Sequence, residues 1–318
     1  MNATYNIGID VGGTNLVAGL VDENNVIICR TGRPTDRTMT LERLVGDVNG
    51  MIDELLSAAH TDKSDIASVG ICVPGTANLT TGELEFANNL PNLQGNLPAA
   101  VEQACGIKTF FENDANAAAL GEYVAEGEPE GGFVMVTLGT GVGGGVILNG
   151  GLLRGINFAA AELGHMTIDM HGPECSCGRR GCFEMYGSAE ALKKQAAAAG
   201  LTIQEAKQVF DLFREHDRTA EQVVEQYSTY LAEGLANIIN IFQPKTLSLG
   251  GGVSKASDIL LPMVGERMRP LIYSRHAAIN TQLKAAVLYN DAGILGAANL
   301  YRAVAVNTAR RDRRQAVT

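Results

Sequence analysis

Three cysteines and a histidine lie close together in the chain at spacings that suit a metal ion. Cys175, Cys177 and Cys182 fall within eight residues of ECSCGRRGCFE, and His165 precedes the first of them by ten residues. Thiolates and imidazole are the ligands that Zn²⁺ takes in closed tetrahedral sites, where four protein ligands leave no position open for chemistry. We therefore predict a structural Zn²⁺ site made of these four side chains.

The other interpretation of this cluster is a set of three unrelated buried thiols. Disulfides are not expected in it, because Cys175 and Cys177 stand only two residues apart and the cytoplasm is reducing. The remaining cysteines stand singly in the chain, and we expect free buried thiols at Cys29, Cys72 and Cys105.

Two glycine-rich turns that also carry threonine could hold a polyphosphate. They are DVGGT (10–14) and TLGTGVGG (137–144), and backbone N–H groups converge easily on an anion where residues lack Cβ. Asp10 ends an apolar run, where a carboxylate is costly without a partner, so we predict that it holds a Mg²⁺-bound water. The alternative is plain hairpin chemistry. The residues predicted to contact nucleotide are Asp10, Gly12, Gly13, Thr14, Asn15, Thr137, Gly139, Thr140 and Gly141.

The run GTGVGG (139–144) formally matches a dinucleotide-binding fingerprint, but its context does not. That fingerprint requires a helix to begin at the third glycine, whereas GGGVILNGG (143–151) continues as a β-branched run that ends in Asn-Gly and predicts a hairpin. A third glycine turn separates a buried strand from a helix, where a flat ring and a phosphate could both approach the backbone. Its predicted contacts are Gly250, Gly251 and Gly252.

Composition and charge narrow the class of protein. The chain has 318 residues, 46% of them hydrophobic and 19% charged, which is typical of a globular enzyme with two domains. A net charge of −10 repels nucleic acids and anionic lipid surfaces. We find no apolar run of about 18–20 residues and no signal peptide. The expectation is a cytoplasmic protein without nucleic-acid or membrane partners.

Hydrophobic periodicity predicts two halves that begin alike, each with a strand, a polar glycine-rich turn and a second strand. In the first half we expect strands at 5–13, 15–22, 25–30, 68–73 and 108–113, and helices at 41–59, 97–105 and 115–126. In the second half we expect strands at 132–139, 143–151, 246–252 and 284–289, a helical region at 188–242, and helices at 256–268 and 292–303.

The motifs taken together resemble a known family. DVGGT, LGTGVGG and LGGGV are similar to the ATP-binding turns of the sugar kinase, hexokinase and actin superfold, and AAELGHMTID followed by CSCGRRGCFE resembles the signature of the ROK family (repressor, open reading frame, kinase). The resemblance covers nearly the whole chain. It implies an α/β protein of two actin-like (ribonuclease H-like) domains with an interdomain cleft. We expect residues 1–118 plus 296–318 to form the smaller domain, closed by the C-terminal helix. Residues 119–295 are expected to form the larger domain, with the zinc loop that carries Cys175, Cys177 and Cys182.

The same resemblance implies roles for residues near the zinc loop. His165 would bind zinc and also touch the sugar, and Glu162 and Glu184 would accept hydrogen bonds from sugar hydroxyls. Carboxylates suit this task because each oxygen accepts O–H donors. The zinc loop would then fix the wall that carries both acids.

The segment FFENDANAAALGE holds the residues that the family resemblance connects with the reaction. From the residues alone, Asp114 would be a helix N-cap. The resemblance instead implies that Asp114 accepts the proton of the attacking sugar hydroxyl, while Asn113 binds an adjacent hydroxyl. Asn88 is a further expected sugar contact, with Asn89 as its neighbour, and the backbone at Gly75 is expected near the sugar.

The resemblance implies an ATP- and Mg²⁺-dependent hexose kinase, with glucose phosphorylated at its 6-hydroxyl as the first expectation. Fructose, mannose, allose and N-acetylmannosamine are alternatives, and so is a non-catalytic sugar sensor. Repressors of the family carry a helix-turn-helix domain before the first strand, which starts here by Tyr5, so a kinase is expected. Many relatives have lysine where Asn15 stands, so here Mg²⁺ must supply that charge or the reaction must dispense with it. Relatives are often homodimers or homotetramers, and the same is expected here.

Overall fold

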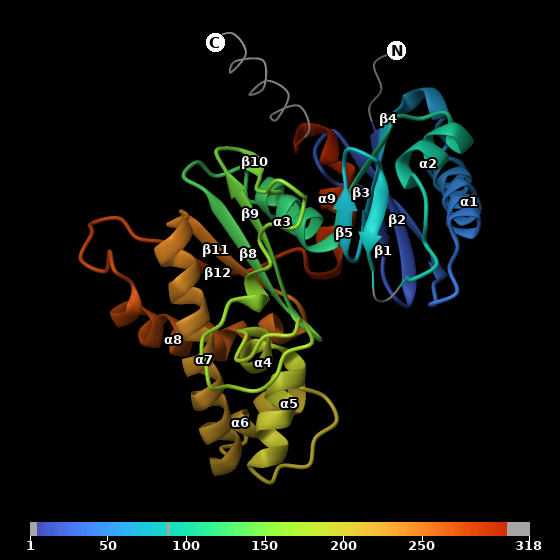
Figure 1. Cartoon of the computed structure of the whole chain (residues 1–318). Helices are drawn as coiled ribbons and strands as arrows, with labels where there is room; N and C mark the ends of the chain where they lie inside the picture. Colours follow the sequence, from blue (N-terminus) through green and yellow to red (C-terminus); the bar gives the residue numbers. More distant parts are fainter. Residues whose placement is uncertain (1–4, 88–89, 304–318) are drawn as a thin grey trace. The chain divides into compact units, whose positions relative to one another are not determined.

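The computed structural model describes residues 5–87 and 90–303, in which helices and strands form two compact units (Figure 1). Unit 1 contains Met1–Glu128, Gly145–Ala160 and Asn290–Thr318, and unit 2 contains Pro129–Gly144 and Ala161–Tyr289. The domain boundaries expected from the sequence stay a prediction.

Unit 1 is built on a five-stranded sheet with the order β3-β2-β1-β4-β7. Its first three strands form the predicted antiparallel meander, and β4 and β7 run parallel to β1. The strands are β1 (Tyr5–Val11), β2 (Asn15–Asp22), β3 (Ile27–Pro34), β4 (Ile66–Val73) and β7 (Thr109–Asn113). A separate two-stranded sheet consists of β5 (Thr76–Asn78) and β6 (Glu83–Phe86).

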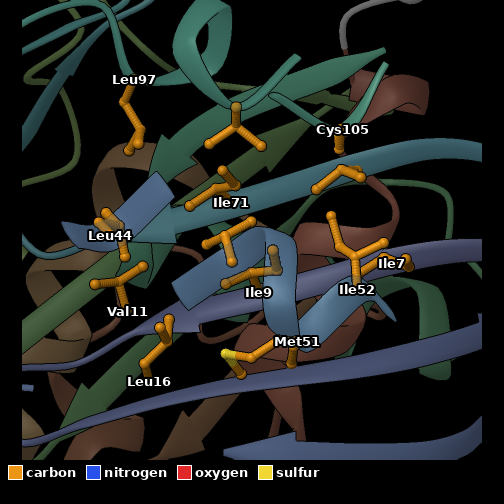
Figure 2. Packing of buried hydrophobic residues seen from close by; sticks show 14 of the residues in the cluster. Ile7, Ile9, Val11, Leu16, Leu44, Met51, Ile52, Ile71, Leu97 and Cys105 are labelled. Carbon is orange, nitrogen blue, oxygen red and sulfur yellow. The ribbon is translucent and has the colours of Figure 1, made fainter. Parts of the chain in front are cut away.

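One face of the unit 1 sheet is apolar and carries the core. Helices α1 (Leu41–Ala59) and α2 (Leu97–Cys105) pack against it, and α1 has the predicted bounds because Thr40 caps its start and His60 ends it in the left-handed conformation. Figure 2 shows the buried side chains of this core: Ile7, Ile9, Val11, Leu16, Leu44, Met51, Ile52, Ile71, Leu97 and Cys105.

The opposite face of the same sheet is lined by glycine, because successive residues of a strand point to opposite faces. A Cβ on Gly8 would lie 1.9 Å from the carbonyl oxygen of Ile294, and a Cβ on Gly70 would lie 1.8 Å from that of Ala297. Helix α9 (Ala292–Ala298) therefore packs on β1 and β4 at backbone contact. Asp10 and its register partner Cys72 belong to this face too, since they lie two residues beyond the two glycines.

The second sheet has the order β10-β9-β8-β11-β12, which repeats the connectivity of the first and confirms the internal repeat. Its strands are β8 (Phe133–Leu138), β9 (Val142–Leu148), β10 (Gly151–Leu152), β11 (Thr246–Gly250) and β12 (Gln282–Ala285). A strand, not a helix, follows the second glycine turn, and β9 and β10 form the predicted hairpin through Asn149 and Gly150 at positive φ.

The last strand of this sheet was predicted at the wrong residues. The expectation was 284–289, whereas β12 spans Gln282–Ala285 and a 3₁₀ turn occupies Tyr289–Asp291. Because β12 pairs only with the Thr246–Leu249 part of β11, its pairing ends where β11 enters the third glycine turn.

The helices of unit 2 divide the helical region predicted at 188–242 into three. Gly200, at positive φ, follows α5, and Asp217 caps α7, which packs against α8 (Figure 1). Within the described parts of the chain, none of the helices combines the length and apolarity that a membrane span requires. The helices are α4 (Glu184–Gly187), α5 (Ala189–Ala198), α6 (Lys207–Arg214), α7 (Arg218–Phe242) and α8 (Ser257–Met268) in unit 2, and α3 (Asp114–Ala125) in unit 1.

Candidate functional site

The predicted metal ligands come together in unit 2. The ligand atoms of His165, Cys175, Cys177 and Cys182 all lie within 4.8 Å of one another. The Sγ atoms of Cys177 and Cys182 are 3.6 Å apart, as are Cys175 Sγ and His165 Nδ1. Zn–S bonds of about 2.3 Å in a tetrahedron place sulfur atoms about 3.7 Å apart, so the donor set fits Zn²⁺. All six cysteines of the chain are free thiols.

Backbone hydrogen bonds hold the loop that carries these ligands. Thr167 pairs with Cys182 in an antiparallel bridge, and the N–H of Cys175 donates to the carbonyl of Arg179 at 2.8 Å. Burial, followed by the neighbouring thiols Cys177 and Cys175, raises the pKa of Cys182 to about 12. A divalent cation at the centre of the cluster would supply the positive charge that favours the thiolate.

Glu184 directly follows the predicted zinc loop, and its carboxylate contacts the second glycine turn. Its Oε2 accepts a hydrogen bond from the N–H of Val142 at 3.0 Å. A Cβ on Gly141 would lie 2.3 Å from the same oxygen, so glycine is needed where the carboxylate meets the turn. Thr140 and Glu184 also line one small pocket of ≈ 120 Å³, together with Lys194.

The segment with Glu162 and His165 also approaches Val142, the first residue of β9. Leu163–His165 forms a 3₁₀ turn, and a Cβ on Gly164 would lie 2.1 Å from the carbonyl oxygen of Val142. Val142 therefore contacts both predicted sugar-binding segments, through its N–H to Glu184 and its carbonyl side to Gly164. Glu162 is exposed and His165 is half-buried.

The second and third glycine turns meet at the end of β8. Thr137 is the register partner of Gly250, and a Cβ on Gly251 would lie 2.5 Å from the carbonyl oxygen of Leu138. Gly251 has φ +82°, a conformation that glycine adopts without strain. The nucleotide contacts predicted in these two turns thus share one edge of unit 2, and the N–H of Ala189 donates to the carbonyl of Gly139 there at 2.8 Å.

A pocket of ≈ 420 Å³ opens beside the third turn. Its apolar lining includes Phe210 of α6 and Val253 and Ala256 beyond the turn. Its charged lining has both signs: Glu205, Lys207, Asp211, Arg214 and Lys255. Gly252 belongs to the same wall. A concave site that combines apolar and charged side chains can bind a small molecule.

In unit 1, Asp10 lies on the glycine face of the sheet. Burial raises the pKa of its carboxyl, and the thiol of Cys72 approaches its Oδ1 at 3.5 Å. A Cβ on Gly293 of α9 would lie 2.4 Å from its Oδ2. Among the described residues Asp10 has no cationic partner, so this carboxylate suits a metal ion. Burial, and then the carboxylates of Asp10 and Asp114, raise the pKa of Cys72, which places both acids near this thiol.

The first glycine turn is held by a residue that the sequence did not point to. Thr35 is buried just after β3, and its Oγ1 donates to the carbonyl of Gly12 at 2.6 Å. Its N–H donates to the carbonyl of Thr14 at 2.9 Å, and the N–H of Gly12 donates to the carbonyl of Asn15 at 2.8 Å. Thr14 and Asn15 are exposed at the tip, and the half-buried Gly13 lies between the braced positions.

Three of the predicted sugar contacts meet at the end of β7. Asn113 Nδ2 donates to the carbonyl of Gly75 and to Asp114 Oδ1, each at 3.0 Å, and Asp114 Oδ1 also accepts the N–H of Ala115 at 2.8 Å. The N-cap of α3 is Asn113, whose Oδ1 accepts the N–H of Asn116. The interpretation of Asp114 as the cap was therefore wrong, and its half-buried carboxylate lies on the first turn of the helix.

The predicted site residues thus form one group in each unit. Asp10, the first turn, Gly75, Asn113 and Asp114 belong to unit 1. The predicted zinc ligands, both predicted sugar-binding acids and the other two glycine turns belong to unit 2. Asn88 and Asn89 lie outside the described residues. Sequence reasoning missed Gly293 and Thr35, because neither stands in a motif.

Comparisons with known proteins agree over nearly the full length of the chain. The ROK family model matches residues 6–304. The glucokinase of Thermotoga maritima is 36% identical over 314 residues, covering 93% of this chain and 96% of its own. The N-acetylmannosamine kinase of Salmonella arizonae is 35% identical over 298 residues, covering 92% and 97%.

A solved structure gives the same result for the fold. The crystal structure of a ROK family glucokinase from Streptomyces griseus, in complex with glucose and AMPPNP, has 32% sequence identity and a TM-score of 0.76. The alignment covers 93% of this chain and 98% of that one. The two-unit α/β structure is the actin-like fold expected from the motifs, and the chain belongs to the ROK family.

Proposed function

We propose that this protein is an ATP-dependent hexose kinase that phosphorylates glucose at the 6-hydroxyl. The observation that carries the proposal is the Asp114 carboxylate, held by Asn113 Nδ2 and the N–H of Ala115 on the first turn of α3. Its support from relatives is the similarity to the glucokinase of Thermotoga maritima. The similarity to an N-acetylmannosamine kinase keeps that sugar, with fructose, mannose and allose, among the alternatives.

In this proposal Asp114 is the general base. As the sugar oxygen forms its bond to the γ-phosphorus, the hydroxyl proton passes to the Asp114 carboxylate, and the bond from that phosphorus to the β,γ-bridging oxygen breaks to release ADP. Both Asn113 Nδ2 hydrogens already have acceptors, so Asn113 would take a sugar hydroxyl hydrogen at Oδ1 rather than donate one.

The predicted nucleotide contacts would bind different parts of ATP. Asp10 would hold Mg²⁺ through water, and Mg²⁺ would neutralise charge that develops on the phosphates. Backbone N–H groups of the first and second turns would cradle those phosphates. We place the adenine in the pocket beside Gly252, where Phe210 and Val253 are apolar.

The sugar would be oriented from the zinc loop. Glu162 and Glu184 would accept its hydroxyl hydrogens, and Asn88 would add a contact. His165, with one ring nitrogen on Zn²⁺, would donate its other ring N–H to a hydroxyl oxygen. Zn²⁺ bound by the four ligands would supply no reacting group, because no coordination position would be open. Its role would be to tie His165 to the loop that ends at Glu184, which the contacts of Val142 with both segments support. We further propose that the enzyme works in the cytoplasm as a homodimer or homotetramer.

The first test is release of ADP from ATP and Mg²⁺ with a panel of glucose, mannose, fructose, allose and N-acetylmannosamine. Turnover should be highest on glucose. Asp114→Asn should retain glucose binding but lose phosphoryl transfer by a factor of about 10³ or more. Asp53→Asn, at an exposed position of α1, is the matched control and should keep full activity.

Each outcome bears on a separate part of the proposal. Full activity of Asp114→Asn would remove the general base. Higher turnover on N-acetylmannosamine than on glucose would assign the enzyme to that substrate. No turnover on any sugar, with the protein folded, would favour a sensor over a kinase.

A further inference from the structure

A buried ion pair lies next to the turn of Asn113 and Asp114, which carries the predicted general base, and neither residue of the pair was a predicted site residue. Glu112 is the residue before Asn113 in β7, and Arg154 follows β10; both belong to unit 1. Arg154 Nε and Glu112 Oε2 are 2.6 Å apart, and the side chains are 9% and 1% exposed. Both side chains of the pair are therefore largely shielded from solvent.

The second oxygen of Glu112 connects this pair to the catalytic turn. Glu112 Oε1 accepts the N–H of Asn113 and the side-chain Nδ2 of Asn116, each at 3.1 Å. Asn116 in turn donates its backbone N–H to Asn113 Oδ1 at 3.0 Å. Asn113 then donates its Nδ2 to Asp114 Oδ1 at 3.0 Å. An unbroken series of hydrogen bonds therefore runs from the Arg154 guanidinium to the Asp114 carboxylate.

Stability alone does not account for such a pair. Taking two charges out of water costs several kcal/mol per ion, and well-packed apolar residues of similar volume often serve a fold equally well. An apolar pair would, however, leave the Asn113 N–H and Asn116 Nδ2 without the acceptor that both share. Only a polar residue at position 112 can supply that acceptor to the turn that carries Asp114.

We propose that Glu112, paired with Arg154, is a positioning residue for Asp114 in phosphoryl transfer. Its Oε1 fixes the backbone of Asn113 and the side chain of Asn116, and these together hold Asn113 Nδ2 on Asp114 Oδ1. The carboxylate thereby keeps one orientation toward the sugar hydroxyl. This inference rests on the proposed kinase function and names two residues that support its general base.

Two double variants separate positioning from folding. Glu112→Gln with Arg154→Gln keeps an oxygen acceptor for Asn113 and Asn116. The amide oxygen at position 154 would take the place of Arg154 Nε and accept a hydrogen bond from the amide nitrogen at position 112. Glu112→Met with Arg154→Met has a similar volume and no charge, but it offers no acceptor. Lys108→Met, which breaks the exposed pair with Glu102 near the start of β7, is the control for losing a cation.

The measurements are kcat and KM for glucose and ATP, with thermal unfolding of each variant. The methionine pair should remain folded at the assay temperature, although two donors lose their acceptor. It should lose kcat by about 10- to 100-fold, with KM for ATP changed less than about threefold. The kcat of the glutamine pair should be at least about tenfold higher than that of the methionine pair, and the kcat of Lys108→Met should match the wild type. Wild-type kcat in the methionine pair, or equal losses in both pairs, would overturn the inference.

A structural readout keeps the inference testable if the wild type phosphorylates no sugar. That result would refute the proposed function by itself. Crystal structures of the two double variants then decide on the positioning. The contact of Asn113 Nδ2 with Asp114 Oδ1 should persist in the glutamine pair and be lost in the methionine pair, and its persistence in both would refute the role of Glu112.

Discussion

Gly293→Ala tests whether the position of Asp10 is critical for use of ATP. The new Cβ would lie 2.4 Å from Asp10 Oδ2 and 2.8 Å from its Cγ. Non-bonded heavy atoms are comfortable at about 3.5 Å, so the carboxylate has to move by about 1 Å. A displacement of this size in a catalytic arrangement costs roughly 100-fold, or about 2.7 kcal/mol.

The assay is kcat/KM for ATP at several Mg²⁺ concentrations, combined with urea denaturation. We expect kcat/KM for ATP to fall about 100-fold, while overpacking of about 1–3 kcal/mol is partly offset by the roughly 1 kcal/mol that alanine adds to a helix. Gly46→Ala is the matched control, because a Cβ there in α1 meets no atom within 4 Å. The control should gain stability and keep its activity. A Gly293→Ala enzyme within threefold of the wild type in kcat/KM for ATP would refute the role given to Asp10.

Three further predictions concern the metal and the fold. Cys177→Ser removes a proposed ligand, so zinc content measured by atomic absorption should fall and KM for glucose should rise; unchanged zinc would refute the ligand assignment. Tyr227→Phe removes the hydrogen bond to the carbonyl of Gly187 at 2.6 Å and should cost about 1–2 kcal/mol in urea denaturation at neutral pH. Burial raises the pKa of Tyr227 above its usual 10.0, so the wild type loses stability as the pH rises past that value. The difference in free energy of unfolding between the wild type and Tyr227→Phe should therefore narrow above that pH. Gly296→Ala places a Cβ 1.7 Å from the carbonyl oxygen of Ala117 and should cost about 3 kcal/mol; wild-type stability would contradict this close packing of α9 on α3.

Local patterns predicted the elements that carry the motifs. The α1 helix has its predicted bounds because both of its ends are set by neighbouring residues, Thr40 and His60. The hairpin after the second glycine turn followed from Asn149 and Gly150. The bounds of β12 were missed because they depend on how much of β11 is available for pairing, which no local pattern encodes.

The candidate site divides in the same way. The cysteine spacing and the glycine turns contained enough information to predict a metal centre and phosphate-binding turns, because those ligands are close in sequence. The capping of α3 by Asn113, in place of Asp114, could not be decided locally, since Asn and Asp are both favoured at that position.

By itself, the sequence predicted the family, the actin-like fold that the family implies and the four side chains that the structure brings together, because these predictions depend on residue types at short spacings. Only the tertiary structure decided what surrounds the two carboxylates. Gly293 meets Asp10 from a helix more than 280 residues away in the chain, and Arg154 reaches Glu112 across 42 residues. Such contacts form when β-strands and helices pack together, and the chemistry of a buried acid is set by whatever that packing places beside it.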